Sequence, residues 1–139
     1  MNRVKIKISS VQGVGKETER IENICFGTFG KTEDGFTVCY KEKTEKDTPE
    51  TETSILITKD KTATVKRTGG MSSTLIIKEN EKTECLYSSM IGDMMLCLFG
   101  KSVNYRLTDK GGEIYLNYLI SQQDRIISNN EVRIIIKEV

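Results

Sequence analysis

Five polar side chains in this sequence combine residue types that could bind a small ligand: Tyr40, Glu42, Arg67, Tyr87 and Tyr105. Each lies on or beside a segment with strand-like patterning, so each could point into the interior of a β-barrel. An arginine in such an interior needs a carboxylate partner, because an unpaired buried charge is costly. That partner could be Glu42, in a structural pair near the rim with tyrosines closing the barrel end, or the acid group of a ligand.

Histidine is absent from the sequence. Its absence excludes Ser-His-Asp and Cys-His nucleophile systems, histidine-ligated zinc and the commonest general base near neutral pH. Catalysis would have to use carboxylates, lysine, tyrosine or cysteine with shifted pKa values, and no spacing of these residues indicates such a site. The sequence therefore favours a non-enzymatic protein with no catalytic residue, no cofactor and no metal.

The cysteines are spread along the chain without a C-x-x-C pair, at Cys25, Cys39, Cys85 and Cys97. This spacing fits neither a zinc knuckle nor a thioredoxin-type redox motif. Each cysteine lies inside a strand-like run, so we expect reduced thiols packed as small apolar residues.

Length and composition indicate one globular domain spanning residues 1–139, with 37% hydrophobic and 29% charged residues. The net charge is only +1, and no basic block stands out, which argues against nucleic acid as a partner. No run approaches the roughly 20 apolar residues of a membrane helix, and the N-terminus does not read as a signal peptide. We therefore expect a cytoplasmic protein without a membrane partner.

Apolar and polar residues alternate along most of the chain, which is typical of strands buried on one face. The alternation is clearest at Val4, Ile6 and Ile8, and again at Ile114, Leu116, Tyr118 and Ile120. Short turn signals separate these segments and no βαβ alternation appears, so we expect an all-β, antiparallel up-and-down meander of about 8 to 10 strands.

Two long segments indicate that this meander closes into a barrel. Residues 17–31 contain Gly27 and Gly30, and residues 94–107 contain Gly100. Long strands bent at glycine let an antiparallel sheet curl and close on itself, and closure removes exposed strand edges.

Three further segments carry specific expectations. The most apolar run, residues 86–107, predicts a central hairpin that turns at Gly92-Asp93. Residues 41–54 contain no apolar residue and predict a solvated loop. A short helix could form near Ser121–Ile127 or within Ser88–Met95.

The order of several short motifs resembles the uncharacterised YwiB-like proteins of Gram-positive bacteria. The matching features are Glu19 to Gly27 followed by Phe29, Tyr40-Lys41-Glu42, Arg67-Thr68-Gly69, the set Thr83, Tyr87, Gly92 and Leu96, and Gly112 to Tyr118. The chain departs from the family at Met90-Ile91, where the family often has proline, and at Ile76-Ile77, where it has an aromatic residue. The resemblance implies a calycin-like (lipocalin-like) β-barrel and no assigned activity.

Two functions fit these observations. The first is a non-enzymatic barrel that binds a small amphipathic or apolar ligand, which requires a cavity of roughly 300 Å³ or more. The alternative is a homo-oligomeric interaction module without a ligand. Residues 94–99 are apolar on both faces, and a barrel wall buries only one of them, so the other face would need cover.

Overall fold

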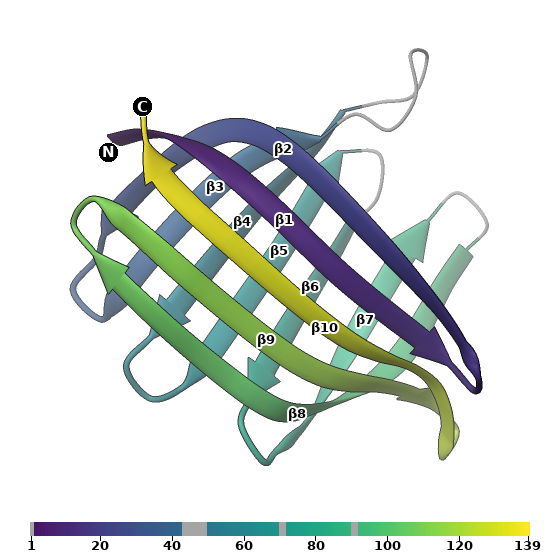
Figure 1. Cartoon of the computed structure of the whole chain (residues 1–139). Coiled ribbons are helices and arrows are strands. Elements are labelled where there is room, and N and C mark those ends of the chain that lie inside the picture. Colours follow the sequence, from purple (N-terminus) through teal and green to yellow (C-terminus); the bar gives the residue numbers. More distant parts are fainter. Residues whose placement is uncertain (1, 43–49, 70–71, 90–91) are drawn as a thin grey trace.

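The computed structural model describes residues 2–42, 50–69, 72–89 and 92–139, and these residues form ten strands (Figure 1). The strands are β1 (Asn2–Val14), β2 (Glu17–Lys31), β3 (Gly35–Glu42), β4 (Thr51–Thr58), β5 (Thr62–Gly69), β6 (Ser72–Lys78), β7 (Lys82–Ser89), β8 (Gly92–Thr108), β9 (Gly111–Gln122) and β10 (Arg125–Glu138).

The ten strands form one closed antiparallel barrel in which each strand pairs with its neighbours in sequence. Strand β1 closes the barrel by pairing with β10, so the two chain ends lie side by side (Figure 1). This arrangement confirms the predicted up-and-down β-barrel. In the part of the chain that the structure describes, no helix is long and apolar enough to cross a membrane.

The short helix considered at Ser121–Ile127 is wrong. Gln123 and Asp124 form the turn between β9 and β10, and both have positive φ angles, of 50° and 63°. Residues without a glycine signal supply this turn, which is why the sequence pattern did not indicate it.

The predicted glycine bends have two different forms. At Gly100 the pairing of β8 with β9 shifts register before Ser102, which is the irregularity expected of a bent strand. At Gly27 the register is continuous, but a Cβ atom would lie only 2.0 Å from the backbone oxygen of Cys39. Glycine is required there because β2 and β3 approach too closely for any side chain.

The central hairpin is confirmed, with a corrected turn. Strands β7 and β8 pair from Lys82 with Phe99 to Ser89 with Gly92. Gly92 therefore already belongs to the strand, and residues 90–91 lie outside the described part of the chain. Of the predicted loop 41–54, β3 extends to Glu42, β4 begins at Thr51, and residues 43–49 lie outside the described part of the chain.

The barrel has two chemically different ends. We call the end that holds both chain termini the apolar end; the other, where β1 turns into β2 and β9 into β10, is the polar end (Figure 1). Near the apolar end the rings of Phe29 and Phe36 stack with centroids 5.6 Å apart. Aliphatic side chains fill the space around and above them, including Val4, Ile6, Ile57, Ile77, Ile114 and Ile136. One half of the interior is therefore a solid core.

Candidate functional site

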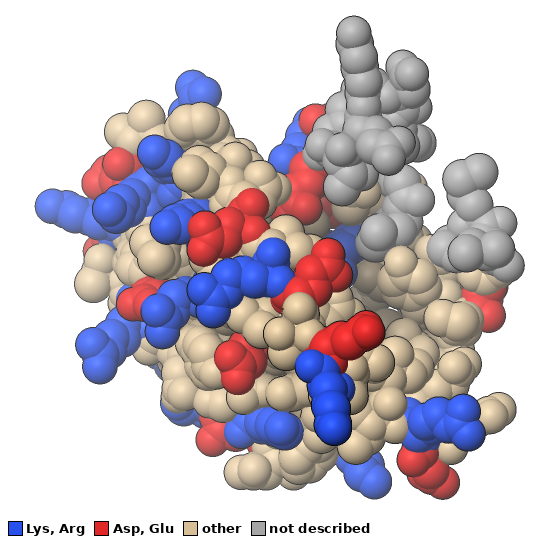
Figure 2. Space-filling view, turned by 45° about the vertical axis from the view of Figure 1, so that its right-hand side comes forward, with Lys and Arg blue, Asp and Glu red and all other residues tan. Residues whose placement is uncertain are grey.

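The interior of the polar end is hollow. Two neighbouring cavities of about 340 Å³ and 250 Å³ lie there, and both are lined by Ser10, Arg67, Tyr118 and Val132. Figure 2 turns this end toward the viewer and shows a recess in the surface. The larger cavity meets the size expected for a small-ligand site.

The polarity of the interior follows from the inner face of each strand. Along β5 the inward positions are Ala63, Val65 and Arg67, running from the apolar to the polar end. The same change occurs on other strands: from Ile77 and Leu75 to Ser73 on β6, from Val38 to Tyr40 and Glu42 on β3, and from Ile134 to Asn130 and Ser128 on β10. Strand alternation selects the inner face, and the sequence of each strand sets its polarity.

Arg67 lies between the two cavities, because it lines both of them. Burial raises the pKa of Tyr40, Tyr118 and Cys85, which lie on three other strands, and the charge of Arg67 opposes this rise in each of them. Among the described residues no ion pair joins the guanidinium to Glu42 or to any other carboxylate. The structural Arg67–Glu42 pair considered from the sequence is therefore not formed.

Two tyrosines beside Arg67 are held as neutral phenols. Burial is the main cause that raises the pKa of Tyr40 far above its ordinary value; the charge of Glu42 adds to this effect and Arg67 opposes it. Burial likewise raises the pKa of Tyr118. A neutral phenol can donate a hydrogen bond, so these two side chains can serve an anionic acceptor next to Arg67.

The seam between β6 and β7 leaves a buried hydroxyl without a partner. These strands pair through Ser72 with Ser88 and Ser73 with Tyr87, among the residues that the structure describes. The Oγ atom of Ser73 is buried at the wall of the smaller cavity and makes no hydrogen bond to any residue that the structure describes. An unsatisfied buried hydroxyl costs free energy, so its place on the cavity wall indicates a polar group supplied from the cavity.

The structure brings four of the five predicted residues to this interior and separates the fifth. Tyr40, Glu42 and Arg67 line the larger cavity, and Arg67 and Tyr87 line the smaller one. Tyr105 packs against the apolar core near the other end of the barrel, opposite Ile114.

Sequence reasoning missed several polar residues of the cavity walls, among them Ser73, Tyr118 and Asn130. Tyr118 belongs to the alternating segment that also contains Ile114 and Leu116, so the sequence could have predicted that its side chain points inward. Ser73 and Asn130 carry no motif. Their signal is only that a polar residue replaces an aliphatic one at an inward position.

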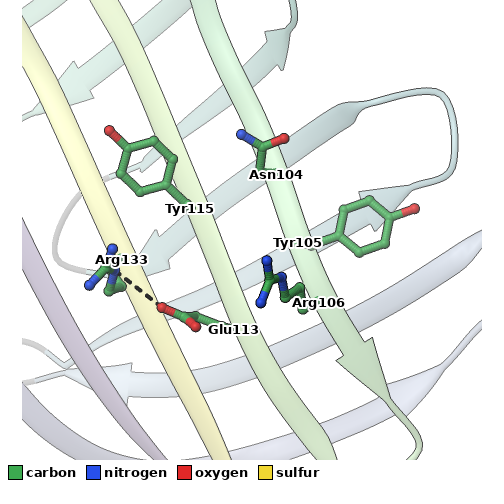
Figure 3. Close-up of a pocket in the computed structure, with 6 residues that line it drawn as sticks. All are labelled: Asn104, Tyr105, Arg106, Glu113, Tyr115 and Arg133. Carbon is green, nitrogen blue, oxygen red and sulfur yellow. Dashed lines mark ion pairs between the residues drawn. The ribbon is translucent and has the colours of Figure 1, made fainter.

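A third hollow of about 490 Å³ is a groove on the outer wall (Figure 3). The residues that line it are Asn104, Tyr105, Arg106, Glu113, Tyr115 and Arg133. The ring of Tyr105 points away from the other five side chains in Figure 3. Arg133 Nε and Glu113 Oε1 lie 3.2 Å apart and both side chains are about half exposed. This groove is open to solvent, and among the described residues that line it no buried side-chain group lacks a partner, so the interior is the stronger candidate.

Comparison with known proteins agrees with this architecture. The family model for a domain of unknown function, DUF1934, matches residues 6–134. The chain belongs to this family. Its structure is similar to the crystal structure of the ywiB protein from Bacillus subtilis, with a TM-score of 0.87 over 99% of this chain and 92% of that chain, at 18% identity. The resemblance to YwiB-like proteins is thus confirmed, and at this identity the likeness shows the fold alone. None of the curated proteins with which the chain was compared matches it.

Proposed function

We propose that this DUF1934 member is a non-enzymatic barrel that binds a small amphipathic molecule with an acidic head group in the polar end of its interior. The observation that carries the proposal is Arg67, a cation on the wall of both cavities that forms no ion pair with a described carboxylate. A charge in a partly dehydrated site is stabilised when an anion binds beside it.

The surrounding groups suit such a head group. Tyr40 and Tyr118 are neutral donors, and Ser73 offers a hydroxyl without a partner. Ligand sites commonly combine apolar walls with a few convergent polar groups. Here Ile8, Ile55, Val65 and Val132 supply the apolar wall for the rest of the molecule. Their position below Arg67 predicts that the apolar part points toward the core and the acid group toward the polar end.

The proposal is tested by titrating the protein with anilinonaphthalene sulfonate, a fluorescent amphipathic anion. We expect saturable binding that Arg67→Met weakens by about 10- to 100-fold, because a hydrogen bond to a charged group contributes about 1.5–3 kcal/mol. Arg67→Lys should retain part of the affinity, since it keeps the charge and loses the planar fork.

Arg133→Met is the matched control, because it removes an arginine from the outer wall and should leave binding unchanged. Circular dichroism must show that every variant is folded. Equal affinity of folded Arg67→Met and wild-type protein would contradict the proposal. Native mass spectrometry of freshly purified protein then identifies any bound molecule, and a ligand without an acid group would contradict the role given to Arg67.

A further inference from the structure

Strand β2 leaves part of the barrel with a free edge. It pairs with β1 along almost its whole length, from Glu17 to Phe29, but with β3 only from Gly27 to Lys31. Strand β3 itself continues to Glu42, but beyond Tyr40 it pairs only with β4, on its other edge. Within the described chain, residues 17–26 therefore have no partner strand on one side, and residues 17–24 are all exposed.

This edge lacks three of the usual protections against pairing, although it carries the charged residues Glu17, Glu19, Arg20 and Glu22. Exposed edges are commonly blunted by proline, lysine or a bulge. Residues 17–26 contain neither proline nor lysine, and their register with β1 is continuous. Three large apolar side chains on the segment are about half exposed: Ile21 (49%), Ile24 (56%) and Phe26 (55%). The segment is therefore a long, regular template with unpaired backbone groups.

We propose that two copies of this chain associate through this edge, as an antiparallel pair of β2 strands centred on Ile21. The occupant is a second copy because the segment, although it carries three glutamates and one arginine, can pair with itself without placing like charges opposite one another. A two-fold axis at Ile21 places Arg20 of each copy opposite Glu22 of the other, which gives two cross-strand ion pairs on the outer face.

Strand geometry restricts the choice of register. In an antiparallel pair, residues that lie opposite one another point to the same face of the sheet, whereas successive residues of one strand point to opposite faces. A two-fold axis between two identical strands must therefore lie at a residue, which then faces its own copy. An axis at Arg20 would oppose two arginines, and an axis at Glu22 would oppose two glutamates. The axis at Ile21 avoids both contacts and also brings Thr18 opposite Ile24. It pairs residues 17–25 of each copy.

Another outer feature is weaker. On the face formed by β7 and β8, Leu86 and Met95 are cross-strand neighbours and both are about half exposed. The sequence had indicated this face, residues 94–99, as the interface. Its inner side chains Leu96 and Leu98 are buried in the barrel, and no charge pattern on its outer side selects a partner or a register.

A charge-swap experiment tests both the association and its register. Sedimentation velocity of the full chain at tens of micromolar should detect a dimer. Arg20→Glu alone and Glu22→Arg alone each place like charges opposite one another twice, so each should weaken dimerisation by about tenfold or more. The double variant R20E/E22R should restore it. An equimolar mixture of the two single variants should form heterodimers, because each copy then presents the charge that the other lacks.

Cross-linking provides the second readout. Ile21→Cys should form an intermolecular disulfide under mild oxidation, since opposite residues in an antiparallel pair have Cα atoms about 4.5–5.5 Å apart, within disulfide reach. Thr18→Cys, on the same exposed strand but opposite Ile24, is the matched control and should cross-link far less. A wild-type protein that stays monomeric at these concentrations would overturn the proposal. So would a dimer that the single charge variants leave intact, which places the contact on another surface such as Leu86 and Met95.

Discussion

The two ends of this barrel are built from the same strands and differ in what their inner faces carry. At the apolar end, Phe29 packs among aliphatic side chains of the core. At the polar end, the same strands present Arg67, Tyr118 and Ser73 around hollow space. The difference shows that closure of the sheet does not decide whether a barrel is filled. Side-chain volume and polarity along each strand decide it, and here they divide the barrel into a stabilising half and a half open to a ligand.

The largest effect that would sharpen this comparison is expected from Phe29→Ala. Phe29 is 1% exposed and stacks on Phe36, so its removal leaves a cavity in the solid half. We expect the free energy of unfolding to fall by about 3–5 kcal/mol in chemical denaturation. Phe26→Ala removes the same side chain from the outer face of the same strand and should cost less than about 1 kcal/mol, even though Arg3 lies over that ring. Similar losses from both variants would contradict the division of the interior.

The sequence predicted the fold because alternation and turn spacing are local signals. Val4, Ile6 and Ile8 were assigned to one face, and Val4 and Ile6 are fully buried while Ile8 packs against the core. The bend at Gly100 was predicted because a glycine inside a long strand is typical of a bend or bulge. Each of these inferences needs only the neighbouring residues of one strand.

The site was less readable because it depends on which strand positions share a level of the barrel. Tyr105 has the residue type and direction of a site residue, yet the register of β8 against β9 places it in the core half. Ser73 lies beside the cavity because β6 and β7 meet there. The free edge of β2 arises where β3 diverges from it after Gly27 and Tyr40, a tertiary event with no local signal.

An effect of intermediate size is expected at alkaline pH, where two buried tyrosines of the polar end should make the stability of the protein depend on pH. Tyr40 and Tyr118 keep their protons when folded because burial raises their pKa, whereas an unfolded tyrosine loses its proton near its ordinary value of 10.0. Below pH 10 this contribution to stability is complete, and it decreases as pH rises further, by at most about 1.4 kcal/mol per pH unit for each tyrosine. Tyr40→Phe and Tyr118→Phe should flatten the fall in stability above pH 10 relative to their own values at neutral pH. An unchanged slope in both variants would show that other groups govern the alkaline transition.

The smallest effect is expected on the outer wall, where the same kind of cation as Arg67 has a partner. Arg133 and Glu113 form an ion pair on exposed strand faces, so solvent and salt screen their attraction. A double-mutant cycle with Glu113→Gln and Arg133→Met should give a coupling energy below about 1 kcal/mol that decreases further in high salt. A coupling well above that value would mean that the outer groove is less hydrated than its exposure indicates. Arg133 is paired and exposed, whereas Arg67 lines the cavities and forms no ion pair with a described carboxylate. With a strong coupling at Arg133, this contrast would no longer separate a solvated surface contact from a binding residue.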